Sequence, residues 1–211
     1  LSFFVRLIVL VSCQSNPKPK KEFQYNQLNY SINGDLSEDS LLLKLIEPYK
    51  DSLGSELDET VAISNESLHK DKPEGKLGNL VSDAIYGFVK DSLRIDNFIC
   101  VFNNGGLRRP LPEGSINRRM IYELLPFENY LTLMELNEEE FNELLHYIRK
   151  SNGLPISGMN IKFKANGVHS FKGITRSSEG TYKVLTSDYL ANGGDNMRFW
   201  KDSKRTDFNI L

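Results

Sequence analysis

The residues of this chain that are best suited to bind a ligand follow a short apolar run. Residues 97–102 predict one buried β-strand, and Asn103-Asn104-Gly105-Gly106 follow it as a turn. Two glycines permit positive φ and let the backbone approach a ligand closely. Arg108 and Arg109 come next, and a guanidinium binds anions through a planar set of donors. This loop therefore suggests a site for a flat or anionic small molecule; a surface hairpin with two solvated arginines is the alternative.

The elements around this loop belong to a globular chain of ordinary composition. The sequence has 211 residues, of which 39% are hydrophobic and 26% are charged, so one substantial core is expected. The net charge is −2 and the isoelectric point is about 6.0. The chain has no basic field, so we expect no nucleic-acid polymer as a partner.

The amino-terminal residues predict export. Residues 1–12 are largely apolar but too short to span a bilayer, as in a secretory signal peptide. They end in Leu10-Val11-Ser12-Cys13, which resembles the lipobox of bacterial lipoproteins, and lipidation of Cys13 would anchor the chain to a membrane. Residues 13–35 are then a tether. Cys100, the second cysteine, is predicted to be a small core residue because it lies in the apolar strand. A buried strand with an incidental cysteine is the alternative to the signal.

The remaining pattern mixes helices and strands without strict βαβ alternation, so it favours an α+β fold for residues 36–211. Helical spacing predicts helices over residues 40–50, capped by Asp35 or Ser37, and over 77–88 and 138–150. Asn137 and Glu140 form a capping-box pair before the last of these. Further strands are predicted at residues 61–63, 130–136, 160–165 and 182–186, and an irregular one at residues 23–32.

Four motifs and one helix then resemble a known family. The motifs are NNGGLRRPLPEG, LPFEN, SNGLPISGM and DYLANGGDN, and the helix begins LGNLVSDAI. In this order they resemble the C-terminal, substrate-binding domain of the 5′-nucleotidase, UDP-sugar hydrolase and cyclic-nucleotide phosphodiesterase family. The resemblance covers roughly residues 36–200 and implies a mixed sheet with packed helices.

The resemblance also implies roles for particular side chains. Two aromatic rings would clamp a nucleobase, an aspartate would hold the ribose hydroxyls, and an arginine would contact sugar or phosphate. The other positions would contact the base. The corresponding residues here are Asn103, Arg108, Phe127, Asn129, Gly153, Tyr189 and Asp195. Relatives often have Phe at the position of Tyr189. Core packing for the two rings and a turn for Asp195 are the alternatives.

The family hydrolyses phosphate esters with two metals held in a separate amino-terminal metallophosphatase domain. The three histidines here, His69, His146 and His169, lie in no D-x-H or G-N-H motif. Arg109, Arg118 and Arg119 are expected to be solvated, and Lys70 and Lys72 match the family's phosphate-binding arginines poorly. We therefore expect no catalytic or metal-binding residue and no cofactor in this chain, and no turnover by the chain alone.

The resulting hypothesis is the substrate-specificity half of a split 5′-nucleotidase, a hydrolase of nucleotide catabolism. A separate metallophosphatase chain would supply the two divalent metals. The signal-like segment occupies the place of the catalytic domain, which favours a natural stand-alone half in the bacterial cell envelope, facing the periplasm or the exterior. A nucleotide- or nucleoside-binding lipoprotein for capture or uptake is the alternative, and a structural remnant that binds nothing is a weaker one.

Overall fold

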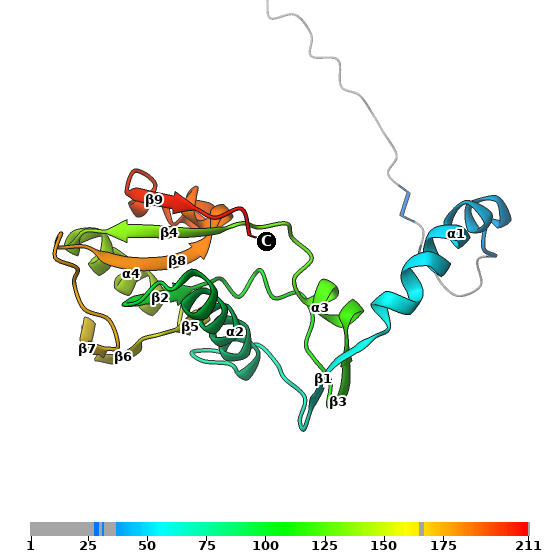
Figure 1. Ribbon diagram of the computed structural model, residues 1–211, viewed down its shortest axis with the longest axis horizontal. Coiled ribbons are helices and arrows are strands. Elements are labelled where there is room, and N and C mark those ends of the chain that lie inside the picture. The colour runs from blue at the N-terminus through cyan, green and yellow to red at the C-terminus, as the bar shows by residue number, and fades with distance from the viewer. Residues whose placement is uncertain (1–27, 30, 32–36, 165–166, 211) are drawn as a thin grey trace, which may run out of the picture. The chain divides into compact units, whose positions relative to one another are not determined.

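The computed structural model describes residues 28–29, 31, 37–164 and 167–210 (Figure 1). The predicted signal segment, Cys13 and most of the predicted tether lie outside these residues. By their contacts the described residues divide into two units, the first ending at Leu45 and the second beginning at Ile46. Within the described part, no helix is both long and apolar enough to cross a membrane.

A five-stranded mixed sheet forms the centre of the second unit (Figure 1). Its order is β5-β2-β8-β4-β9, in which β2 and β8 are parallel and the other neighbours are antiparallel. The strands are β5 (Ile156–Ser157), β2 (Phe98–Val101), β8 (Tyr182–Ser187), β4 (Leu131–Leu136) and β9 (Lys204–Asp207). The mixed sheet with its helices confirms the predicted α+β class.

The side chains of β2 alternate between the two faces of the sheet, and each face packs against a separate hydrophobic core. Ile99 and Val101 join a core with Phe141 and Leu144, which lie on α4 (Glu138–Lys150). Trp200 completes this core from the carboxyl-terminal segment, which contains α5 (Asp188–Ala191) and the 3-10 helices η1 (Gly194–Asn196) and η2 (Arg198–Trp200). Phe98 and Cys100 point to the opposite face, where Val89 of α2 (Lys76–Leu93) covers them. Each face of β2 is therefore buried by its own helix.

Helix α4 begins as the sequence predicts. The Asn137 side chain accepts a hydrogen bond from the Glu140 N–H at 3.0 Å, and Glu140 Oε2 accepts one from the Asn137 N–H at 2.8 Å. The helix ends at Lys150, and after the C-cap residue Ser151 the chain turns away through Asn152 and Gly153, which have φ values of 53° and 92°. Cys100 is fully buried, and burial raises the pKa of its thiol, so the predicted core role is confirmed.

Helix α1 (Ser40–Leu57) differs from its prediction. It is longer than expected and contains Pro48. The predicted caps are wrong, because the Asp39 carboxylate accepts hydrogen bonds from the N–H groups of Leu41 and Leu42, at 2.8 and 3.3 Å. Asp39 directly precedes the first helical residue and is therefore in the position to cap it.

Two small sheets complete the fold. The predicted strand at residues 61–63 is β1 (Thr60–Ser64), which pairs with the unpredicted β3 (Gly114–Asn117). Helix α3 (Arg118–Leu124) follows β3 directly and was also not predicted. The predicted strand at residues 160–165 is β6 (Asn160–Lys164), and its partner is β7 (Gly167–Lys172).

Candidate functional site

The loop after β2 folds around the side chain of Asn103. A Cβ on Gly105 would lie 3.1 Å from Asn103 Nδ2, and one on Gly106 would lie 3.1 Å from Asn103 Oδ1. Neither glycine uses the positive φ that its type permits. These glycines instead leave room for the Asn103 amide, which any larger residue would crowd.

Asn103 joins two other predicted residues in one hydrogen-bonded network. Its Nδ2 donates to Asp195 Oδ2 at 2.6 Å, and the Tyr189 hydroxyl donates to Asp195 Oδ1 at 2.8 Å. The Asp195 N–H donates back to the Tyr189 oxygen at 3.2 Å. The hydrogen bond to the Asp195 side chain raises the pKa of the Tyr189 phenol, and the backbone hydrogen bond opposes this effect. Residues that lie 92 positions apart in sequence therefore form one polar group.

Tyr147 belongs to this network and was not predicted. Its hydroxyl donates to the Asp195 carbonyl oxygen at 2.7 Å. This hydrogen bond holds the backbone of Asp195, which lies in the left-handed region with φ 50° and ψ 27°. Tyr147 lies on α4, 48 residues from Asp195, so nothing in the local sequence indicates this contact.

Arg108 and Phe127 form the second group. The guanidinium carbon of Arg108 lies 5.7 Å from the centroid of the Phe127 ring, which is a cation–π distance. The Arg108 N–H also donates to the Leu124 carbonyl at 2.9 Å, which joins the loop to the end of α3. Phe127 is 53% exposed and Tyr189 is 46% exposed, so both rings leave surface open to a ligand.

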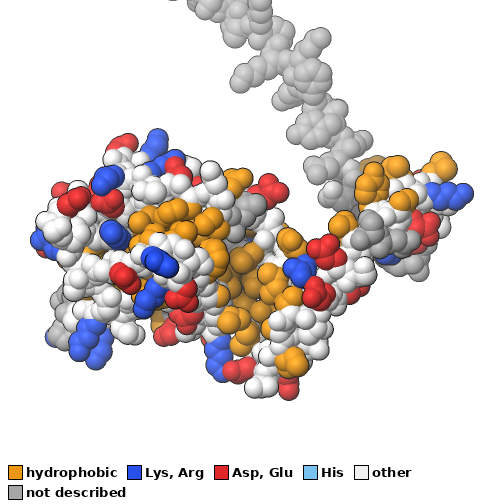
Figure 2. Space-filling model, in the orientation of Figure 1, with side chains coloured by type: hydrophobic (Ala, Val, Ile, Leu, Met, Phe, Trp, Pro, Cys, Tyr) orange, Lys and Arg blue, Asp and Glu red, His pale blue; other side chains and the backbone are white. Residues whose placement is uncertain are grey.

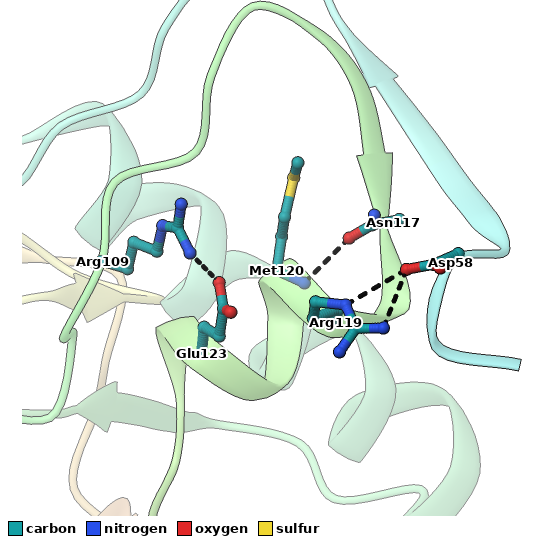
Figure 3. Close-up of polar contacts among 6 residues, drawn as sticks. All are labelled: Asp58, Arg109, Asn117, Arg119, Met120 and Glu123. Atoms are coloured by element: carbon teal, nitrogen blue, oxygen red, sulfur yellow. Dashed lines mark hydrogen bonds and ion pairs between the residues drawn. The ribbon is translucent and has the colours of Figure 1, made fainter. Parts of the chain in front are cut away.

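Phe127 follows α3 in the chain, and a helix cap and ion pairs hold that helix in place (Figure 3). Asn117 caps α3 by accepting a hydrogen bond from the Met120 N–H at 3.0 Å. Arg119 pairs with Asp58 at 3.0 Å, and Arg109 pairs with Glu123. Arg118 also forms an ion pair, with Glu59 at 2.6 Å, and this hydrogen bond and charge raise the pKa of its guanidinium. The three arginines are partly exposed, as predicted, but each is engaged by a carboxylate rather than simply solvated.

Gly153 lies where two loops meet. A Cβ at this position would be 1.7 Å from the Pro73 carbonyl oxygen, so only glycine fits against the 69–75 loop. The Asn104 side chain donates to the Gly153 carbonyl at 3.5 Å. Lys72 binds the neighbouring Ser151 carbonyl at 2.6 Å, and Lys70 binds the Leu107 carbonyl at 3.1 Å. Both lysines therefore hold the predicted site loops in place.

A cavity of about 940 Å³ opens beside these groups, and Figure 2 shows hydrophobic side chains gathered in a hollow on this face. Asn103, Phe127 and Asn129 line it together with Leu131 and Phe88. The other four predicted residues do not line it: Arg108, Gly153, Tyr189 and Asp195. Asn103 therefore belongs both to the cavity and to the network with Tyr189 and Asp195, and Arg108 lies against Phe127 of the cavity. Gly153 lies apart from both, against the Pro73 carbonyl.

The described residues do not form a metal centre. No group of three or more His, Cys, Asp or Glu side chains among them could hold a metal ion. His146 is exposed on α4, as predicted.

This chain is similar to known proteins. Residues 56–202 match the family described as the 5′-nucleotidase C-terminal domain. A 5′-nucleotidase of Vibrio vulnificus is 26% identical over 195 residues, which cover 85% of this chain and 34% of that protein.

Solved structures show the same fold. The 5′-nucleotidase precursor from Thermus thermophilus superimposes with a TM-score of 0.62 and 23% identity, over 82% of this chain and 38% of that one. The NAD nucleotidase of Haemophilus influenzae gives a TM-score of 0.56 and 16% identity, over 80% and 36%. The chain thus spans about a third of the length of these proteins.

Proposed function

Because the chain belongs to the family of 5′-nucleotidase C-terminal domains, we propose that it binds a nucleotide and provides the substrate specificity of a phosphate-ester hydrolase. The network of Asn103, Tyr189 and Asp195 is the observation on which this proposal mainly rests. It places a carboxylate, an amide and a half-exposed ring together, and these groups suit a ribose, a base edge and a base face.

Phe127 and Tyr189 stack on the base in this proposal. Aromatic stacking on a nucleobase tolerates different bases, because each base has a π face. Asn103 and Asn129 then contact the edge of the base, as does the backbone at Gly153, where the 69–75 loop leaves no space for a side chain. Specificity among bases would come from these polar groups.

Arg108 orients the phosphate. The ion pairs among the described residues engage Arg109, Arg118 and Arg119, but none of them involves Arg108. Its guanidinium donates to the neutral Gly105 carbonyl at 3.5 Å, so its charge is not neutralised by a carboxylate and can attract an anionic ligand. A guanidinium can bind a phosphate through two donors. Its position over Phe127 puts this charge beside the proposed base-stacking ring.

A separate metallophosphatase chain carries out hydrolysis with two divalent metals, and this chain presents the nucleotide to it. Cys13 carries a lipid that holds the chain at the bacterial cell envelope, facing the periplasm or the exterior. The sequence of residues 1–13 supports this location, because an apolar segment ends there in a lipobox-like motif.

Calorimetric titration of AMP, adenosine and UDP-glucose into the whole chain tests the proposal. We expect binding, and we expect no phosphate release with added Mg²⁺, Mn²⁺ or Zn²⁺. Adding a metallophosphatase chain encoded beside this one should then produce phosphate release. Binding without any such partner would favour capture or uptake, and metal-dependent release by the pure chain would contradict the split enzyme. If the chain binds none of the three ligands, nucleotide binding by this chain is contradicted.

A further inference from the structure

We propose that the Tyr189 hydroxyl positions Asp195 and thereby makes the site select ribose over 2′-deoxyribose. This inference rests on the proposed function, since it assumes that a nucleotide binds here. It assigns to Tyr189 a role that its aromatic ring alone could not perform.

The contact between the two residues closes a small ring. The hydroxyl donates to Asp195 Oδ1 at 2.8 Å and accepts from the Asp195 N–H at 3.2 Å. One oxygen atom therefore binds both the side chain and the backbone of Asp195. This double contact restrains the rotation of the carboxylate relative to its own main chain. A phenylalanine at position 189 would retain the ring and lose both hydrogen bonds.

The hydrogen-bonding capacity of the carboxylate matches a diol. An ionised carboxylate offers about four lone pairs. The Tyr189 hydroxyl uses one on Oδ1, and Asn103 Nδ2 uses one on Oδ2 at 2.6 Å. One lone pair on each oxygen remains, which is the number that the two hydroxyls of a ribose require. Because both oxygens are already held, the carboxylate cannot readily turn to compensate for a missing hydroxyl.

Two further residues hold this arrangement. Tyr147 donates to the Asp195 carbonyl at 2.7 Å, whereas Tyr189 contacts the N–H and the carboxylate of Asp195. A Cβ on Gly194 would lie 2.6 Å from two atoms of the Tyr189 ring, so the glycine allows the ring to lie against the backbone. The position of the ring and the orientation of the carboxylate are thus fixed together.

The test compares ribonucleoside and 2′-deoxyribonucleoside 5′-monophosphates by calorimetric titration into the whole chain. We expect the wild type to prefer the ribonucleotide by roughly tenfold or more, as is typical of one hydrogen bond to a charged group. Tyr189→Phe should bring the two affinities to within about threefold of each other, chiefly through a loss of ribonucleotide affinity, because the aromatic ring still stacks on the base. Tyr86→Phe removes a hydroxyl from a ring that stacks on Phe98, outside the network, and should leave the preference unchanged.

The possible outcomes separate the two proposals. If the wild type binds neither ligand, the proposed function fails and this inference fails with it. If Phe127→Ala weakens binding but Tyr189→Phe keeps the full preference for ribose, only this inference is wrong. An equal loss of both affinities in Tyr189→Phe would show a structural role and would also overturn it. Near-ultraviolet circular dichroism shows whether Tyr189→Phe folds. If it does not fold, Tyr147→Phe replaces it and should reduce the preference for the ribonucleotide. An unchanged preference in Tyr147→Phe would overturn the inference.

Discussion

The guanidinium of Arg108 lies over the ring of Phe127, with its central carbon 5.7 Å from the ring centroid. The two residues come from different segments, the loop after β2 and the loop after α3. Their contact places a cation beside an exposed aromatic surface, and a nucleotide needs both close together.

Phe127→Ala should weaken AMP binding by roughly tenfold or more, because base stacking is worth about 1–3 kcal/mol for each ring. Calorimetric titration of the whole chain measures this loss. Phe163→Ala is the matched control, since Phe163 is an exposed phenylalanine on β6. Unchanged AMP affinity in Phe127→Ala would remove this ring from the site.

Arg108→Gln should weaken AMP binding but not adenosine binding, because only AMP carries the phosphate that the guanidinium would contact. A hydrogen bond to a charged group contributes about 1.5–3 kcal/mol, so the AMP affinity should fall by about tenfold or more. Arg109→Gln serves as the control, since Arg109 is already paired with Glu123. A parallel loss for adenosine would instead indicate that Arg108 supports the loop or the ring of Phe127.

The Tyr189 phenol should ionise at a higher pH than an ordinary tyrosine. The neutral phenol donates to Asp195, and ionisation would remove that hydrogen bond and place a negative charge beside a carboxylate, so the pKa is raised. The stabilising contribution of this group is therefore complete below the ordinary tyrosine pKa and is lost as the pH rises through the raised value.

Spectrophotometric titration can isolate this group from the nine tyrosines of the chain by subtracting the curve of Tyr189→Phe. Asp195→Ala should move the Tyr189 pKa down towards its ordinary value. Asp202→Ala, which changes an exposed aspartate outside the network, should leave it raised. An unperturbed pKa in the wild type would show that the hydrogen bond to Asp195 is not formed in solution.

Gly153→Ala should destabilise the fold by about 2 kcal/mol or more, because the residue has φ 92° and its new Cβ would collide with the Pro73 carbonyl. Urea unfolding measures the change. Gly87→Ala is the control within α2, where nothing lies within 4 Å of the added Cβ, and it should stabilise the helix by about 0.5–1 kcal/mol. A neutral Gly153→Ala would mean that the two loops do not meet as described.

Local patterns determined much of the fold. The capping box of Asn137 and Glu140 predicted the start of α4, because its two hydrogen bonds join residues only three apart. The apolar run at residues 97–102 predicted β2, since a strand buried on both faces is apolar throughout. Strand β9 has only exposed residues and no apolar alternation, so its pairing with β4 could not be read from its own sequence.

The sequence by itself predicted the α+β class from its mixture of helices and strands. Its motifs resembled the family, and that resemblance suggested the seven candidate residues. Only the tertiary structure decided which of them meet. Asn103, Tyr189 and Asp195 share hydrogen bonds, and Arg108 lies over Phe127. Tyr147 reaches Asp195 across 48 residues. Such contacts depend on how the sheet and its helices bring distant segments together. The sequence near each residue therefore does not show which distant residue it will contact.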